Sequence, residues 1–321
     1  MASDTDAVLA PLVIAHRGAC GYLPEHTLPA KALAYGMGAD YLEQDVVATR
    51  DDQLIVLHDI HLDTVTDVAE RFPDRARADG RWYARDFDLE EIRSLRAWER
   101  MNEYLQAAAF PNRFPHQRGR FEVPALEDEI EMIQGMNLAS GRNVGIYPEI
   151  KKPAWHHAEG VDVAAIMLDM LDAYGYRDRT HAVYLQCFDA KETRRLRDDL
   201  GTDLRIIQLL ADNSWGESET DYSALQTDDG LADVAQYADG IGPWLMQLYE
   251  MDDAGQSPIP TRLGELAHEH GLAVHPYTFR ADALAPGFTD YSSLVRWMAE
   301  FVKIDGLFTD FPDLTLRVLG R

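Results

Sequence analysis

The chain has 321 residues, and its 30 basic and 55 acidic side chains give a formal net charge of −25 at pH 7. An excess of this size repels nucleic acid and anionic lipid, so we expect neither nucleic acid nor a stable membrane association as a partner. The hydrophobic content of 46% is that of a globular protein with a large core. The length suits a single α/β barrel domain, residues 1–321, that carries insertions.

The amino-terminal segment, MASDTDAVLAP, has neither the basic nor the apolar region of a secretory signal. The sequence therefore leaves open a cytoplasmic protein and an exported protein whose signal is absent from this chain. No apolar run approaches the roughly 18 residues of a membrane span. Cys20 and Cys187 lie beside or inside predicted strands and are expected to be buried free thiols. The oligomeric state is not indicated by the sequence.

Eight short apolar runs, separated by segments of helical periodicity, predict buried parallel strands. Strands that alternate with helices form a parallel sheet, and eight such strands close a (β/α)8 barrel. We therefore predict the α/β class with a TIM-type barrel. The predicted strands are 12–16, 40–46, 144–150, 182–188, 204–210, 240–244, 273–278 and 306–309.

A ninth apolar run, residues 54–58, is explained as the second strand of a hairpin. Asp51 and Asp52 predict a two-residue turn, and this turn would place His58 opposite Asp45. In that register His58 folds back over the carboxylates at the barrel mouth. A slip of one residue would turn its side chain away, so the prediction depends on the turn type.

Six segments with helical periodicity fit between the barrel strands. Residues 59–123 do not belong to this alternation; they are rich in arginine, aspartate and aromatic residues and contain one predicted helix at 89–98. We predict that they form an insertion that caps the catalytic end of the barrel. A smaller acidic excursion, 213–233, predicts a surface lobe. The predicted barrel helices are 26–36, 124–135, 161–174, 190–200, 260–270 and 290–302.

Three carboxylates are placed where predicted strands end. Glu43 and Asp45 project from one face of the same strand, because side chains alternate with a period of two. Glu149 ends the next predicted barrel strand, in the segment GIYPEIK. Isolated carboxylates at strand ends are usually just solvated, but three of them without a matching cysteine or histidine cluster predict a hard-oxygen site. Mg²⁺ or Ca²⁺ suits such a site better than zinc.

Basic and imidazole side chains end the neighbouring runs. Arg17 presents a planar fork that matches phosphate oxygens, and Lys151 lies two residues past Glu149 on the same strand face. His16 and His58 could act as general acid and general base, since imidazole titrates near pH 6.5. Together with the carboxylates, these residues indicate metal-assisted phosphoester hydrolysis.

Four further residues at strand ends are candidates for the wall of the pocket: His275, Tyr277, Trp244 and Phe308. Packing in the core is the alternative for each of them, because large aromatic side chains near strand ends are most often buried for stability. For Tyr277, Trp244 and Phe308 core packing is the stronger interpretation, whereas His275 ends an apolar run and is expected at the pocket, behind the groups that contact the substrate.

Eight segments of the chain together resemble the glycerophosphodiester phosphodiesterases, in particular their bacterial periplasmic-type branch, whose enzymes carry an extended insertion after the HD motif. The resemblance runs in order from about residue 12 to residue 319. The segments are VIAHRGACGYLPEHTLPA, ADYLEQDVV, LIVLHD, IYPEIK, YLQCFD, ADGIGP, VHPYTFR and DGLFTDFPD.

This resemblance implies a barrel of the phosphatidylinositol-phospholipase-like kind and a periplasmic location. It implies metal-dependent hydrolysis of glycerophosphodiesters, such as glycerophosphocholine or glycerophosphoethanolamine, to sn-glycerol 3-phosphate and an alcohol. It also implies one divalent cation, with Ca²⁺ favoured and Mg²⁺ as the alternative. The implied residues are His16 and His58 for acid/base catalysis, Arg17 and Lys151 for the phosphate, and Glu43, Asp45 and Glu149 for the cation.

Two other functions are weighed against this one. A lipid-cleaving phosphodiesterase on the same barrel would release a cyclic phosphate and would need an apolar, membrane-facing rim, which the acidic insertion disfavours. A non-catalytic glycerophosphodiester-binding protein would be expected to have lost an acid/base residue or a metal ligand, and this chain keeps them all. The sequence does not decide whether water or the glycerol 2-hydroxyl is the nucleophile.

Overall fold

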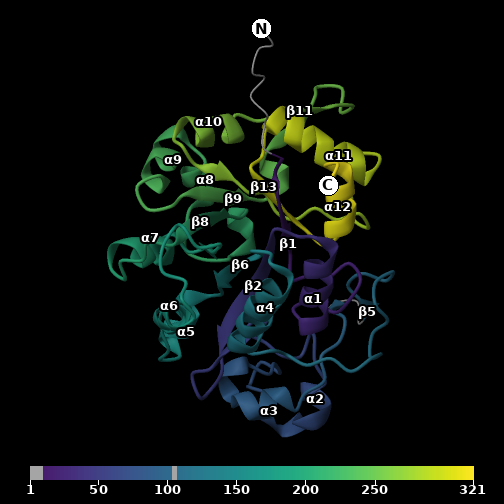
Figure 1. The fold of residues 1–321 in the computed structure, drawn as a ribbon, viewed down its shortest axis with the longest axis vertical. Coiled ribbons are helices and arrows are strands. Elements are labelled where there is room, and N and C mark those ends of the chain that lie inside the picture. The colour runs from purple at the N-terminus through teal and green to yellow at the C-terminus, as the bar shows by residue number, and fades with distance from the viewer. Residues whose placement is uncertain (1–9, 103–106) are drawn as a thin grey trace.

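A computed structural model describes residues 10–102 and 107–321 of the chain. In these residues eight parallel strands lie side by side in the order β12-β9-β8-β7-β6-β2-β1-β13 (Figure 1). The ends of this path meet, because the amide of Asp305 donates to the carbonyl of Val274 and the amide of Phe308 to that of Pro276. The predicted (β/α)8 barrel is confirmed. Its strands are β1 (Leu12–Ala15), β2 (Tyr41–Ala48), β6 (Gly145–Ile150), β7 (Tyr184–Cys187), β8 (Arg205–Leu210), β9 (Gly240–Pro243), β12 (Ala273–Val274) and β13 (Gly306–Thr309).

Helices between the strands form the outer layer of the barrel (Figure 1). The first begins after Thr27, whose hydroxyl accepts from the amide of Ala30, and ends at Gly38 in the left-handed conformation. Its buried alanines, Ala30 and Ala34, let it pack closely on the sheet. The larger outer helices are α1 (Leu28–Met37), α4 (Leu126–Ser140), α6 (Val163–Ala173), α7 (Ala190–Asp198), α10 (Leu263–Glu269), α11 (Tyr291–Trp297) and α12 (Pro312–Val318).

Two predicted helices are shorter than expected. The helix predicted at 260–270 begins at Leu263, because Pro258–Pro260 forms strand β11 and pairs with β10 (Tyr249–Met251). The helix predicted at 89–98 ends at Arg93, because Ala97 bridges to two neighbouring segments instead of continuing the helix. In both cases backbone pairing with a distant segment overrides the local helical pattern.

The predicted register of the hairpin is wrong by one residue. Strand β3 (Leu54–Val56) pairs with β2 so that Val46 lies opposite Val56. The loop has three residues instead of two, with Asp52 left-handed at φ 56° and the Thr49 hydroxyl accepting from the Gln53 amide at 3.0 Å. An aspartate tolerates this conformation better than most residues, which permits the longer loop.

The register places Leu57, not His58, next to Asp45: the Leu57 amide donates to the Asp45 carbonyl at 2.8 Å. His58 nevertheless reaches the barrel mouth, because β3 ends at Val56 and the chain leaves the ladder there. The side chain of His58 is therefore placed by the loop that follows the strand, and not by strand pairing.

The described residues of the range 59–123 have a small apolar core, which packs on the β2–β3 hairpin. Leu62, Phe87 and Ile92 are fully buried in it, against Val47 and Ile55. The short elements here are α2 (Val68–Arg71), α3 (Leu89–Arg93), β4 (Met101–Asn102) and β5 (Ala107–Ala108). In Figure 1, α2 and α3 lie at the end of the molecule opposite α10 and α11. The bounds of this insertion stay a prediction.

The second excursion is a series of short turns and helices. A 3-10 turn at Asn213–Trp215 precedes α8 (Tyr222–Leu225) and α9 (Asp228–Val234).

Among the helices of residues 10–102 and 107–321, none has the length and apolar character needed to cross a bilayer.

A charged pair is buried beneath the carboxylates of β2. Lys31 of α1 lies at 2.6 Å from Glu129 of α4, and neither side chain is exposed. Gln44, on the outward face of β2, donates to the same Glu129 at 2.7 Å. Because each charge compensates the other, the pair fixes two outer helices on the strand that carries Glu43 and Asp45.

We expect Lys31→Met to lower the free energy of unfolding by about 3–5 kcal/mol, because Glu129 would be left as an uncompensated buried charge. Replacing both residues by methionine should recover most of this loss. Urea denaturation measures the effect. Lys191→Met is the matched control, since Lys191 pairs with Glu219 on the surface and both are largely exposed; its effect should stay below about 1 kcal/mol. Equal midpoints for the Lys31 and Lys191 variants would contradict the interpretation.

Candidate active site

A cavity of about 240 Å³ opens at the carboxyl-terminal ends of the barrel strands. Ten of the eleven residues proposed from the sequence line it. His275 is placed deeper, where its Nδ1 lies 2.8 Å from the hydroxyl of Tyr147 inside the barrel. The predicted residues that line the cavity are His16, Arg17, Glu43, Asp45, His58, Glu149, Lys151, Trp244, Tyr277 and Phe308.

The three carboxylates meet because of strand register. In the parallel pair β2–β6, Asp45 lies opposite Glu149, and Glu43 precedes Asp45 by two residues on the same face. Glu43 and Asp45 are each 1% exposed and Glu149 6%. Lys151 lies against them, with its Nζ at 2.7 Å from Glu149 and 3.6 Å from Asp45.

The ionisation of these groups shows a local excess of negative charge. Burial, together with the charge of Asp45, raises the pKa of Glu43 well above its usual range. Burial also raises the pKa of Glu149 to about 8. Burial would raise the pKa of Asp45 as well, but the charge of Lys151 holds it well below its usual range. Glu43 and Glu149 therefore tend to keep a proton in this cluster. A divalent cation would stabilise the charged form of both carboxyls, so this set of oxygen donors fits Mg²⁺ or Ca²⁺.

Arg17 is fixed by both its backbone and its side chain. Its φ of 56° is left-handed, and its amide donates to Glu43 at 2.5 Å. The next residue, Gly18, has a φ of 86°, and a Cβ there would lie 2.8 Å from the Ala30 carbonyl carbon. The Arg17 guanidinium donates to Glu25 at 3.0 Å and lies 3.5 Å from Asp45. Its fork is thereby held at the wall of the cavity.

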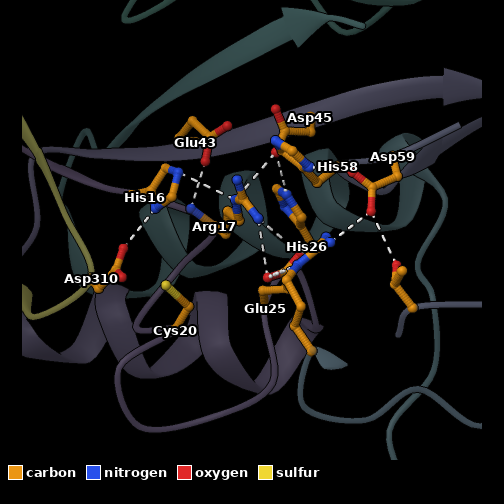
Figure 2. A network of polar contacts seen from close by, with 12 residues as sticks. His16, Arg17, Cys20, Glu25, His26, Glu43, Asp45, His58, Asp59 and Asp310 are labelled. Atoms are coloured by element: carbon orange, nitrogen blue, oxygen red, sulfur yellow. Dashed lines mark hydrogen bonds and ion pairs between the residues drawn. The ribbon is translucent and has the colours of Figure 1, made fainter. Parts of the chain in front are cut away.

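His16 forms a dyad with a carboxylate. Its Nδ1 lies 2.6 Å from Asp310, and the Nε of Arg17 donates to its Nε2 at 3.2 Å (Figure 2). This arrangement leaves the proton on Nδ1 and the lone pair on Nε2. Burial first, and then the charge of Arg17, lowers the pKa of His16 to about 4. The imidazole is therefore neutral near pH 7.

His58 forms a second dyad, with Nδ1 at 2.6 Å from Asp59 (Figure 2). Its side chain is 31% exposed, so it is more open to solvent than that of His16 at 12%. Burial lowers the pKa of His58, and the charges of Arg17 and Lys151 lower it further. Both histidines thus have Nδ1 held by an aspartate, and the Nε2 of His16 also accepts from Arg17.

Sequence reasoning missed several groups of the site. Asp59 and Asp310 lie within segments singled out from the sequence, immediately after His58 and after β13, but no role was given to them. The Nε2 of His26 lies 2.7 Å from Asp45, and its buried Nδ1 has no partner among the described residues. Trp215, from the second excursion, lines the cavity and contacts Trp244 edge to face. An acidic loop gives no local signal of such a role.

The fold and the site together define a class of enzyme. Two imidazole–carboxylate dyads, an arginine and a lysine surround a three-carboxylate cluster at the carboxyl end of an α/β barrel. Neutral imidazoles supply acid/base chemistry, and the cationic side chains complement a phosphate. This is the arrangement of a phosphodiester hydrolase.

Comparison with known sequences identifies the family. The sequence profile of the glycerophosphoryl diester phosphodiesterase family matches residues 16–314. A glycerophosphodiester phosphodiesterase of Haemophilus influenzae is 43% identical over 325 residues, which cover 96% of this chain and 89% of the relative. One of Treponema pallidum is 35% identical, covering 97% of this chain and 92% of its own. The chain belongs to the glycerophosphoryl diester phosphodiesterase family and is a phosphoric diester hydrolase.

Solved structures share the fold. A protein of Silicibacter pomeroyi superposes with a TM-score of 0.73 at 24% identity, covering 97% of this chain and 93% of the other. A phosphodiesterase of Oleispira antarctica, solved in complex with the product sn-glycerol-3-phosphate, gives a TM-score of 0.65 at 18% identity, covering 97% and 98% of the two chains. At these identities the similarity supports the barrel alone.

A buried carboxyl beside the site makes stability depend on pH. Glu99 is 3% exposed, and its Oε2 has no hydrogen-bond partner among the described residues. Burial, with a contribution from Glu25, raises the pKa of Glu99 from 4.5 to about 8. Because the folded state binds this proton more tightly, the stabilisation is complete below pH 4.5 and is lost as the pH rises through 8.

We therefore expect Glu99→Gln, which resembles the protonated form, to raise the melting temperature at pH 9 by about 2 °C or more and to have a smaller effect at pH 5. Differential scanning calorimetry at the two pH values measures the difference. Glu250→Gln, at an exposed position, is the control. A Glu99→Gln protein with the wild-type dependence of melting temperature on pH would show that Glu99 ionises normally in the fold.

Proposed function

We propose that the enzyme hydrolyses glycerophosphodiesters, such as glycerophosphocholine and glycerophosphoethanolamine, to sn-glycerol 3-phosphate and an alcohol. The observation that carries this proposal is the convergence of two dyads and three carboxylates on one cavity. The Oleispira antarctica phosphodiesterase, solved in complex with the product sn-glycerol-3-phosphate, supports the same reaction. A periplasmic location stays a prediction from the resemblance.

Glu43, Asp45 and Glu149 would hold one divalent cation, for which we propose Ca²⁺ over Mg²⁺. When bound, such an ion polarises the phosphoryl group as a Lewis acid. Arg17 and Lys151 would bind the phosphate, since both reach the cavity and are cationic. Their hydrogen bonds to carboxylates keep the two cationic groups in place before the substrate arrives, which favours the charged transition state.

The two histidines would move the protons. His16 is neutral, and its Nε2 electron pair, which accepts from Arg17 in this structure, suits the base that deprotonates the nucleophile. His58 suits the acid that protonates the departing alkoxide, because its side chain is the more exposed. The cations Arg17 and Lys151 lower its pKa; a bound phosphodiester would offset them and favour the protonated imidazole.

The rest of the cavity would accept the carbon skeleton of the glycerol. Four aromatic side chains line the cavity: Phe188, Trp215, Trp244 and Tyr277. Apolar walls with a few fixed polar groups are typical of small-molecule sites, and they exclude water from the reacting phosphate. The carbon atoms of glycerol can pack there while its phosphate faces the cationic groups.

The reaction and the cation are tested by measuring release of sn-glycerol 3-phosphate from glycerophosphocholine. Enzyme treated with a chelator should lose activity, and adding back Ca²⁺, or failing that Mg²⁺, should restore it because the three carboxylates need a cation to stay charged together. Accumulation of a cyclic phosphate as end product, seen by phosphorus NMR, would contradict the hydrolysis. Folded enzyme that is inactive with both cations would contradict the proposed substrate.

The roles of the two histidines are tested by His16→Ala and His58→Ala. Each should lower kcat by roughly 10²–10⁴, since each removes one proton-transfer group. His270→Ala is the matched control, because His270 also pairs with an aspartate, Asp228, at 2.7 Å but lies outside the cavity. Turnover at the wild-type rate by either cavity variant would falsify the acid/base assignment for that residue.

A further inference from the structure

Each of the two dyads ends on an arginine from residues 59–123. The Nη1 of Arg100 donates to Asp59 at 2.6 Å, on the carboxylate oxygen that does not face His58. The Nη2 of Arg113 donates to Asp310 at 2.6 Å, again on the oxygen that does not face the histidine, and the Nε of Arg280 donates to the same oxygen at 2.9 Å. The same kind of contact thus recurs behind both histidines.

Both arginines are themselves held in place. Arg100 donates through Nε and Nη2 to the two carboxylate oxygens of Glu25, at 3.0 and 2.6 Å. Arg113 donates to both oxygens of Asp282, at 2.8 and 3.0 Å, and its guanidinium lies 3.6 Å from the centre of the Phe110 ring. Their side chains are 17% and 4% exposed. A bidentate arginine fixed at both ends is a rigid support for a carboxylate.

These arginines meet the histidines at a second cavity. It has a volume of about 180 Å³, and both histidines and both arginines line it. In the described part of the chain, residues 59–123 therefore reach the barrel at the acid/base groups themselves. Burial would raise the pKa of Asp310, but Arg280, His16 and Arg113 hold it well below its usual range. Burial would likewise raise the pKa of Asp59, but Arg100 and His58 hold it well below its usual range.

We infer that the segment 59–123 is a positioning element for catalysis, in which Arg100 and Arg113 hold the carboxylates that orient His58 and His16. This inference rests on the proposed acid/base role of the two histidines. Asp59 and Asp310 fix the tautomer and the ring orientation of the imidazoles, as outer partners do for catalytic and metal-bound histidines. Arg100 and Arg113 are positioning residues, because they act through these carboxylates and not on the phosphodiester.

Arg113 offers the cleaner test, since Arg100 also contacts Glu25, which holds the phosphate-binding Arg17. Arg113→Gln should lower kcat on glycerophosphocholine about 10-fold or more and change KM by less than about twofold. Arg113→Lys, which keeps the charge but not the fork, should recover part of kcat. Arg93→Gln is the matched control within the same segment; Arg93 pairs with Asp128 at 2.6 Å on the surface and should be silent.

A double-mutant cycle separates positioning from a general structural role. In an Asp310→Asn background, Arg113→Gln should lower kcat by less than about twofold, because the carboxylate that it holds is already gone. Independent, multiplying effects would overturn the inference, and so would a rise in KM at constant kcat, which would place Arg113 on the substrate. Wild-type kcat for folded Arg113→Gln would overturn it as well.

Two further measurements keep the test decisive. Should Arg113→Gln fail to fold, Asp282→Asn removes the second anchor of Arg113 without touching the dyad; a lower kcat at constant KM supports the inference, and an unchanged kcat overturns it. His16→Ala is assayed in parallel. An active His16→Ala enzyme would refute the proposed acid/base role, whereas an inactive one beside a fully active Arg113→Gln enzyme would refute the positioning inference alone.

Discussion

The burial of three carboxylates at one end of the barrel is the constraint that the rest of the site satisfies. Strand register places Asp45 opposite Glu149 and puts Glu43 on the same face, so their proximity follows from the sheet itself. Buried like charges are unfavourable unless cations compensate them. Lys151 and Arg17 supply part of that compensation, and the remaining excess of negative charge makes the cluster suited to a divalent cation.

Beyond the carboxylate cluster, further side chains of alternating charge contact one another in series. Arg17 ends on Glu25, Glu25 accepts from Arg100, and Arg100 in turn donates to Asp59, which holds His58. These charged contacts start at the carboxylate cluster, cross to the inserted segment at Arg100 and return to the barrel mouth at His58. Figure 2 labels Arg17, Glu25, Asp59 and His58. In a buried setting each charged group needs its neighbour, so the position of His58 is linked electrostatically to Arg17, the arginine that we propose binds the phosphate.

Local rules predicted the parts of this site that the sheet determines. The two-residue period placed Glu43 and Asp45 together, and apolar runs located the barrel strands. The hairpin register was wrong because the turn depends on the Thr49 hydroxyl and a left-handed Asp52, which the sequence signals only weakly. Arg100 and Arg113 could not be found at all: the aspartates that they hold lie 41 and 197 residues away, and arginines are common in that segment.

There is a physical reason why the strand carboxylates could be predicted and the supporting arginines could not. Carboxylates on strands are held by backbone pairing, so they need little further support, but His16 follows the end of β1 and His58 follows the end of β3. A loop residue loses side-chain and backbone freedom when it is fixed, and that entropy must be offset by contacts from elsewhere. An aspartate alone can rotate with its histidine, whereas an aspartate clamped from behind by an arginine cannot do so without breaking a charged hydrogen bond. Proton transfer at a defined distance therefore requires a second layer, and in this chain the inserted segment contributes to that layer.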